Sequence, residues 1–219
     1  MDPGRADLII FDCDGVLVDS ELLSCRCLSE VLAEFGFELG LEQALGLFLG
    51  RSTAAIGQYY RERGQILPGE FLPRLKARVL EIFTRSLRPI PGVGAVVSEL
   101  KAPFCVASSS DLDRVSLSLN VTGLASHFGD RLYTAQMVQH GKPAPDLFLY
   151  AAGKMRADPA RALVIEDSVS GVQAAKAAGM TVWGFVGGSH YRGRDGRAIL
   201  SAAGADRVFA HMDDFWKEA

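Results

Sequence analysis

The hydrophobic positions of the chain follow two patterns. Short apolar runs are typical of buried strands, whereas apolar residues three or four positions apart are typical of helices. The first run, Leu8–Phe11, is rich in branched residues and predicts a fully buried strand. After residue 103, similar runs alternate with helical patterns. The predicted strands are 104–107, 131–133, 162–165, 181–185 and 208–209, and the predicted helices between them are 113–119, 146–154, 169–178 and 198–203.

This alternation predicts a parallel sheet, because each strand returns to the sheet through a right-handed helical crossover. We therefore expect an α/β fold in which helices cover both faces of a Rossmann-like parallel sheet. The apolar periodicity of the helices is ordinary core packing and is assigned no function.

A long interval without strand patterns follows the first predicted strand. Its spacing predicts helices separated by Gly50 and by Pro68-Gly69. We expect an all-helical cap domain at residues 19–88, inserted into a core domain made of residues 1–18 and 89–219. The stretch 88–92, Arg-Pro-Ile-Pro-Gly, is expected to move as a hinge together with residues 19–22. The predicted cap helices are 21–35, 41–49, 53–63 and 70–87.

Composition narrows the class of protein. The 219 residues are 48% hydrophobic, enough for a good core and a smaller appended domain, and the net charge of -3 offers no broad basic surface for nucleic acid. The four cysteines lack the paired spacing of a zinc site or a disulfide framework. Neither a signal segment nor a membrane span is found in the pattern. We expect a cytoplasmic protein with reduced cysteines, as a monomer or weak homodimer.

Two aspartates, Asp12 and Asp14, directly follow the first predicted strand. Ligands of open α/β sheets bind at the carboxyl ends of the strands, so these carboxylates stand where a reacting group is expected. Gly15 then allows a sharp turn with positive φ. Taken alone, Asp-x-Asp-Gly is more often a polar turn than a site, and only the later motifs change that interpretation.

Further polar motifs follow other predicted strands. Ser108 comes after the strand 104–107, Lys142 lies in a loop stiffened by two prolines, and Glu166 and Asp167 come after the strand 162–165. Each has an ordinary interpretation, as a turn serine, a solvated lysine or a pair of helix-capping acids. A parallel sheet would bring all of them to one edge.

Together these groups make chemical sense around a phosphate. Several carboxylates at one edge would repel each other unless a cation lay among them, and oxygen ligands with open water positions suit Mg²⁺. The cation and Lys142 would offset the charge of a phosphoryl group. A carboxylate could then attack the phosphate to form an aspartyl-phosphate, and Asp14 is placed to serve the leaving oxygen and afterwards the water.

These motifs resemble those of the haloacid dehalogenase-like superfamily of phosphatases and phosphomutases. DCDGVLVDS, the Ser108 strand end, GKPAPD and VIEDS occur in the family's order, and the resemblance covers essentially the whole chain. The helical insertion resembles the small cap of the subgroup that contains β-phosphoglucomutase and many sugar-phosphate phosphatases. The resemblance implies that Asp12 is the nucleophile, that Asp14 is the general acid and base, that Ser108, Ser109 and Lys142 bind the phosphate, and that Asp12, Asp14 through its carbonyl, Asp167 and Glu166 hold Mg²⁺, Glu166 either directly or through water.

Two further segments are candidates for substrate contact. The segment 48–52, Phe-Leu-Gly-Arg-Ser, resembles a cap loop whose arginine often reaches the non-reacting end of the substrate, so Arg51 is either a specificity residue or an exposed arginine at a helix start. The segment 187–190, Gly-Gly-Ser-His, is expected to be a flexible surface loop, with Ser189 or His190 near the substrate as the alternative.

Members of the family catalyse several reactions, and the residues of this chain favour some of these reactions over others. The founding dehalogenases lack the second aspartate, and related proteins that cleave phosphonates use a cap lysine, for which this cap offers only Lys76 inside a predicted helix. β-Phosphoglucomutase has a histidine at the position of Ser24, and this departure favours hydrolysis.

The sequence therefore predicts a Mg²⁺-dependent phosphatase that acts on a small phosphorylated metabolite, a sugar or sugar-acid phosphate. DCDG followed by LVDSE is similar to bacterial phosphatases active on compounds such as phosphogluconate. The alternatives are a phosphosugar mutase and, from another class, a non-catalytic module that binds a phosphorylated ligand or a partner.

Overall fold

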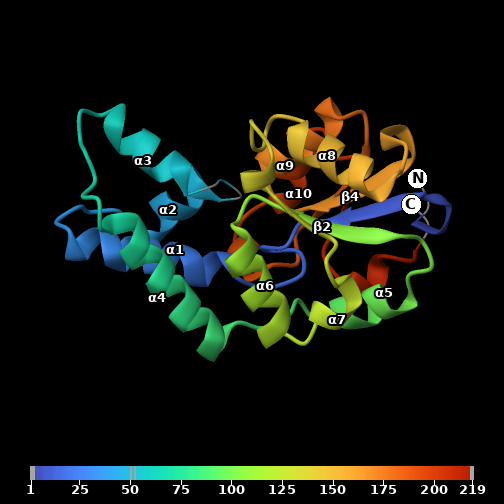
Figure 1. The fold of residues 1–219 in the computed structure, drawn as a ribbon, viewed down its shortest axis with the longest axis horizontal. Coiled ribbons are helices and arrows are strands. Elements are labelled where there is room, and N and C mark those ends of the chain that lie inside the picture. The colour runs from blue at the N-terminus through green and yellow to red at the C-terminus, as the bar shows by residue number, and fades with distance from the viewer. Residues whose placement is uncertain (1–2, 50, 52, 218–219) are drawn as a thin grey trace.

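A six-stranded sheet forms the centre of the protein, whose computed structural model describes residues 3–49, 51 and 53–217. All neighbouring strands pair in parallel, in the order β3-β2-β1-β4-β5-β6. This architecture confirms the predicted α/β fold with a Rossmann-like sheet (Figure 1). The strands are β1 (Leu8–Phe11), β2 (Phe104–Ser108), β3 (Leu132–Thr134), β4 (Ala162–Glu166), β5 (Thr181–Phe185) and β6 (Arg207–Phe209).

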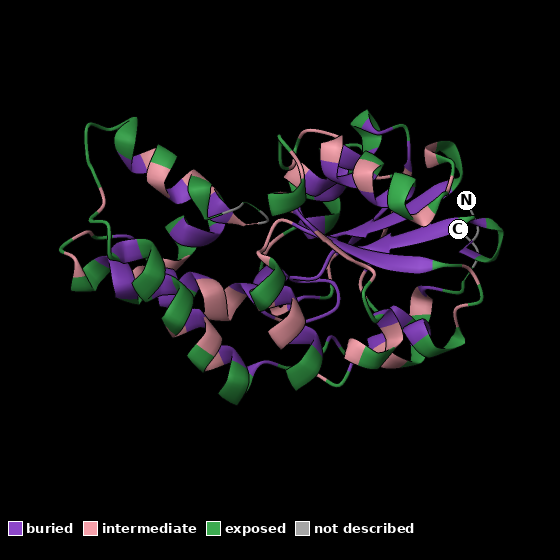
Figure 2. Ribbon diagram, in the orientation of Figure 1, coloured by how far each residue is buried: buried purple, intermediate pink, exposed green. Residues whose placement is uncertain are grey.

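Both faces of the sheet are covered by helices, as Figure 2 shows for the buried strands between them. Ile9 and Phe11 of β1 enter one hydrophobic cluster, whereas Leu8 and Ile10 enter the other. Burial on both faces explains why the strands are continuous apolar runs. The first cluster includes residues of α5 (Val93–Glu99), α6 (Leu112–Val121) and α7 (Ala125–Phe128), and the second includes residues of α8 (Asp146–Met155), α9 (Val169–Ala177) and α10 (Gly196–Ala202).

A helical insertion separates β1 from α5 and lies at the end of the molecule opposite the two chain termini (Figure 1). Its first and last helices pack side by side, and ion pairs of Arg74 with Glu34 and of Arg78 with Glu30 join their surfaces. The insertion lies where the sequence predicts it, and its status as a separate cap domain stays a prediction. Its helices are α1 (Glu21–Glu34), α2 (Leu41–Phe48), α3 (Ala54–Arg61) and α4 (Phe71–Ser86).

The two segments that connect the insertion to the sheet run side by side. The Asp19 amide donates to the Arg88 carbonyl at 3.0 Å, and the Ile90 amide donates to the Leu17 carbonyl at 2.9 Å. Both ends of the insertion therefore pass through one short antiparallel pairing, at the residues where hinge motion is predicted.

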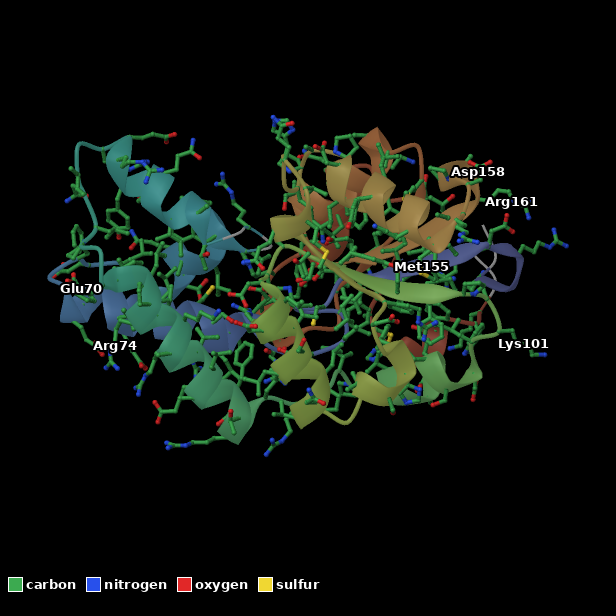
Figure 3. All side chains as sticks on the ribbon, viewed as in Figure 1. Glu70, Arg74, Lys101, Met155, Asp158 and Arg161 are labelled. Carbon is green, nitrogen blue, oxygen red and sulfur yellow. The ribbon has the colours of Figure 1, made fainter. Side chains whose placement is uncertain are left out.

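The amino ends of the strands lie at the other end of the molecule, beside the N terminus. There Arg161, just before β4, forms an ion pair with Asp7, just before β1. Figure 3 shows Arg161 at this end, with Glu70 and Arg74 at the opposite end on the insertion. The charged groups of the amino edge are thus separate from the predicted site at the carboxyl edge.

Some elements differ from the prediction. The helix α5 is not expected from the sequence, because three valines and a glycine give it low intrinsic helix propensity. The helix α7 is a single turn. Ser108 and Glu166 are the last residues of β2 and β4, where the sequence places them just after these strands. Short 3-10 helices occur at Pro3–Arg5, Ala135–Met137, Pro159–Arg161, Ser189–Tyr191 and Met212–Asp214.

Within the described ranges, no helix has both the length and the apolar character needed to cross a membrane.

The packing of β1 gives a prediction about stability. Phe11 is fully buried, and its ring contacts those of Phe104, Phe128 and Phe215 with centroid separations of 6.3 to 6.5 Å. Phe11→Ala is therefore expected to lower the free energy of unfolding by about 3–5 kcal/mol, measured by urea denaturation. The exposed Leu149→Ala serves as the control and should cost less than about 0.5 kcal/mol. Equal losses in the two variants would contradict this account of the core.

Candidate active site

The side chain of Lys142 joins three neighbouring strands at the carboxyl edge of the sheet. Its Nζ atom donates to Asp12 Oδ1 at 2.5 Å, to Glu166 Oε1 at 2.6 Å and to the Ala107 carbonyl at 3.0 Å. The Lys142 side chain is only 1% exposed, so its ammonium group is held by these partners and not by water. Asp12 follows β1 and Glu166 ends β4, and the strand order reverses between these two strands, which is where ligands of such sheets bind.

Burial dominates the electrostatics of this cluster. It raises the pKa of Asp12 well above the ordinary value of 3.8; Lys142 opposes this shift, and the charges of Glu166 and Asp167 add to it. For Lys142, burial works against the charged form, but the carboxylates of Asp12 and Glu166 outweigh it and raise its pKa. The cluster thus carries more negative charge than the one lysine can neutralise.

The carboxylate of Asp167 completes the acidic group. Burial and the charge of Glu166 raise the pKa of Asp167 well above its ordinary value. Its Oδ2 atom is buried and accepts no hydrogen bond within the described part of the chain. It packs directly against Gly15, whose φ is +80° and where a Cβ atom would lie 1.8 Å from Oδ2. The glycine turn predicted after Asp14 therefore also makes room for Asp167.

Glu166 differs from Asp167 because both of its oxygens have partners. Oε1 accepts from Lys142, and Oε2 accepts from the amide and the hydroxyl of Ser168, both at 2.9 Å. Its contacts are those of a residue that holds Lys142, and a metal contact through water would leave them intact.

These residues fit a hard divalent cation. Among the described residues, no group of three acidic, histidine or cysteine side chains is arranged to hold a metal ion. A cation at Asp12 and Asp167 would therefore also need main-chain, water or phosphate oxygens, which suits Mg²⁺ because this ion keeps several waters in proteins. The Asp167 carboxylate, which has an unpartnered oxygen, and the raised pKa values of both aspartates fit a positive charge at this place.

Asp14 has quite different surroundings from Asp12. Its Oδ1 accepts from Ser20 Oγ and Arg114 Nη2, and its Oδ2 accepts from Ser110 Oγ, each at 2.6 Å. Burial raises the pKa of Asp14, but the Arg114 charge and the two hydroxyl groups outweigh it and lower the pKa below the ordinary value. Ser20 precedes α1 but makes no capping hydrogen bond to this helix, because its hydroxyl donates to Asp14.

Arg114, in the first turn of α6, is a member of this cluster that the sequence does not predict. Besides Asp14, its Nη2 donates to Ser24 Oγ at 2.9 Å, and its guanidinium lies 4.9 Å from the ring centroid of Phe83 on α4. It thus connects Asp14 to both α1 and α4. The sequence gives no signal for this role, since an arginine at such a position is ordinarily solvated.

A cavity of about 420 Å³ lies above these groups, between the sheet edge and the helical insertion. Asp12, Asp14, Arg114 and the predicted phosphate-binding serines line its base. Ser108 is buried, and its Oγ accepts from the Ser110 amide at 3.1 Å. The apolar residues of its wall come from the insertion: Leu28, Phe48, Ile56, Leu72, Pro73, Leu75, Val79 and Leu80.

Two cations of the insertion also line this cavity. Arg51 is exposed and donates to the Leu47 carbonyl at 3.4 Å, while Gly50 and Ser52 of its predicted loop lie outside the described residues. Lys76 forms ion pairs with Asp113 at 2.8 Å and with Asp111 at 3.4 Å, so it bridges α4 and the start of α6. The substrate contact of Arg51 stays a prediction.

The expectation of a flexible surface loop at 187–190 is wrong. Ser189–Tyr191 is a 3-10 helix in which His190 and Tyr191 are buried, and it contacts Asp19 and Asp167. The described residues that line the cavity do not include any of this turn, and substrate contact by Ser189 or His190 stays untested. Glycine-rich composition suggests mobility, whereas the glycines here allow close packing.

The pair of Arg114 and Asp14 gives a second prediction. Arg114→Met is expected to lower the free energy of unfolding by about 3–5 kcal/mol, because Asp14 would keep a buried charge without its cation. Adding Asp14→Asn removes that charge, so the double variant should recover much of the loss. Urea denaturation of the wild type, both single variants and the double variant gives the coupling energy. Strictly additive losses would contradict the coupling.

Glu21, the buried first residue of α1, gives a prediction about pH. Burial, together with the charges of Asp14 and Asp167, raises its pKa from the ordinary 4.5 to about 8. Between these values the folded protein keeps a proton that the unfolded chain has released. Its contribution to stability is therefore lost as pH rises from about 4.5 to 8, by up to about 1.4 kcal/mol per pH unit.

The measurement is urea denaturation of the metal-free protein across this pH range. Glu21→Gln should make the slope of unfolding free energy against pH less steep by the contribution of one proton, up to about 1.4 kcal/mol per pH unit. An unchanged slope in E21Q would assign the pH dependence to other acids and contradict the raised pKa of Glu21.

Comparison with known proteins gives the family. The model of the haloacid dehalogenase-like hydrolases matches residues 9–185. The chain is 32% identical to the 6-phosphogluconate phosphatase of Escherichia coli (strain K12) over 85% of each chain. It is 35% identical to the fructose-1-phosphate phosphatase YqaB of the same organism, over 78% of this chain and 92% of that one.

A solved structure agrees with these relatives. The crystal structure of a HAD family hydrolase from Deinococcus radiodurans R1, with bound phosphate and sodium, matches with a TM-score of 0.74 and 35% identity, over 96% of this chain and 93% of that one. The chain therefore belongs to the haloacid dehalogenase-like hydrolase family and is an enzyme of its phosphatase class, as the sequence predicts.

Proposed function

We propose that the protein is a Mg²⁺-dependent phosphatase that hydrolyses a small phosphorylated metabolite through an aspartyl-phosphate on Asp12. One observation carries the proposal: the buried ammonium group of Lys142 contacts Asp12 directly beneath the cavity. A cation fixed beside a carboxylate can accept the charge of a phosphoryl group that this carboxylate attacks.

In the proposed reaction, a phosphate ester enters the cavity with its phosphoryl group toward Asp12. Lys142, Ser108 and Ser109 hold the phosphoryl oxygens, and Asp12 attacks the phosphorus and displaces the leaving oxygen. Mg²⁺ held by Asp12, Asp167 and the Asp14 carbonyl would supply charge neutralisation at the phosphoryl oxygens. Glu166 keeps Lys142 in place through the contact already described.

Asp14 is proposed to give a proton to the leaving oxygen and then to take one from the attacking water. While Arg114 binds Asp14, it holds the pKa of the Asp14 carboxyl group below the ordinary value, so this group is ionised and has no proton to donate. It must therefore separate from Arg114 and take up a proton from solvent before it can act as an acid. Arg114 also contacts Ser24 and Phe83 of the insertion, so movement of α1–α4 at residues 19–22 and 88–92 would change this pair.

We propose a sugar phosphate or sugar-acid phosphate as the substrate. The cavity of about 420 Å³ has room for a small metabolite, and Arg51 and Arg114 in its lining suit a polar or anionic leaving group. The names of the two curated relatives, which act on phosphogluconate and fructose 1-phosphate, support this class.

The proposal predicts metal-dependent release of phosphate. We expect one preferred substrate among sugar phosphates, sugar-acid phosphates, phosphoglycolate and β-glucose 1-phosphate, assayed with Mg²⁺ and then with chelator, and loss of release in chelator. Asp12→Asn should lower kcat by about a thousandfold or more, since it removes the nucleophile. The matched control is Asp130→Asn, on an exposed residue outside the cavity lining, with unchanged kcat.

Other outcomes would redirect the assignment. Each reaction is also checked for isomerised product, because isomerisation without net release would identify a phosphosugar mutase despite Ser24. Binding of a phosphorylated ligand by both the wild type and D12N, without turnover of the panel by either, would favour the non-catalytic module.

A further inference from the structure

The turn Gly188–Tyr191 contains a buried histidine whose environment is unusual. The His190 ring is 1% exposed, and neither ring nitrogen forms a hydrogen bond with a described residue. Its Nε2 atom lies 3.2 Å from Asp167 Oδ2. The relative orientation of the two groups falls short of a hydrogen bond, so both atoms are unpartnered among the described residues. Buried polar atoms without partners are costly, so this close pair needs a physical reason.

The ring is fixed in place from several sides. The amide and the hydroxyl of Ser189 donate to Asp19 Oδ1 at 3.0 and 2.7 Å, and the Tyr191 hydroxyl donates to the Asp167 carbonyl at 2.5 Å. A Cβ atom at Gly188 would lie 2.6 Å from the His190 ring, so only glycine fits there. The turn is thus attached both to the start of the insertion and to the loop that carries Asp167.

The position of His190 argues against direct contact with substrate. The described residues that line the cavity include Asp12 and Asp14 but no residue of the turn Gly188–Tyr191. Whether neutral or protonated, an imidazole ring carries at least one N–H that can donate. The nearest acceptor is the unpartnered oxygen of Asp167.

We propose that His190 is a positioning residue for Asp167: when the metal is bound, its Nε2–H turns from the present 3.2 Å contact to donate to Oδ2 of that carboxylate and leaves the other oxygen to bind a divalent cation. This inference rests on the metal site of the proposed function. Groups that hydrogen-bond to a metal ligand fix its orientation, and their loss typically weakens metal binding about 10–100-fold.

The test compares two replacements of His190 in the full chain. His190→Gln keeps an N–H donor at a similar distance from the backbone, whereas His190→Leu keeps the bulk without a donor. The unfolding midpoint is measured at increasing MgCl₂, and because stability rises as RT ln(1 + [Mg²⁺]/Kd), the fit gives the Mg²⁺ concentration equal to Kd. We expect this concentration to rise about 10–100-fold in H190L and to change only a few-fold in H190Q, with the exposed His211→Leu unchanged.

The metal-free unfolding midpoint separates positioning from a merely structural role. H190L removes unpartnered buried nitrogens, so its metal-free midpoint should equal or exceed that of the wild type while Mg²⁺ binding weakens. Weakened Mg²⁺ binding that follows a lowered metal-free midpoint in both variants would overturn the proposal.

Two further outcomes separate this inference from the metal site itself. Native Mg²⁺ affinity in H190L would overturn the role of His190 and leave the metal site standing. Absence of Mg²⁺ binding by the wild type would overturn both, whereas phosphate release from the substrate panel is measured independently of either.

Discussion

The structure depends on one buried cation, the ammonium group of Lys142, which lies between carboxylates from two adjacent strands. The register that pairs Phe11 with Ile165 brings Asp12 and Glu166 to the same level of the sheet edge. Without Lys142, either carboxylate would be left buried without a cationic partner, and such a loss typically costs several kcal/mol. The arrangement is therefore fixed by electrostatics as well as by packing, as the proposed phosphate contact of Lys142 requires.

Two aspartates only two residues apart have opposite properties in this setting. Burial beside other acids raises the pKa of Asp12, whereas Arg114 and two hydroxyl groups lower that of Asp14 against its burial. The local environment thus separates two chemically identical groups, and this separation fits the proposed division between nucleophile and general acid. It also makes the Arg114 contact a point at which movement of the helical insertion could alter the chemistry.

Much of this site could be predicted because it follows from the sheet. Strand ends can be recognised from apolar runs, and a parallel sheet gathers them at one edge, so the sequence alone is enough to place Asp12, Ser108 and Glu166 together. Arg114 and His190 could not be placed in this way, because their roles depend on which face of a helix or turn meets the site. The glycines before His190 suggest mobility from composition alone, and only the packing distances show why they are needed.

The antiparallel pairing of the two linkers has a consequence for how the chain assembles. The central strands β1 and β2 pair Ile9 with Phe104, so the whole insertion lies within the loop that this pairing closes. The entropic cost of closing a loop grows with the length of chain that is free to move. Helices formed by local contacts, with ends held together by the hydrogen bonds of Asp19 with Arg88 and of Ile90 with Leu17, take residues 19–88 out of that free length. We therefore expect the segment that lines the cavity in the finished molecule also to ease the pairing of the two central strands during folding.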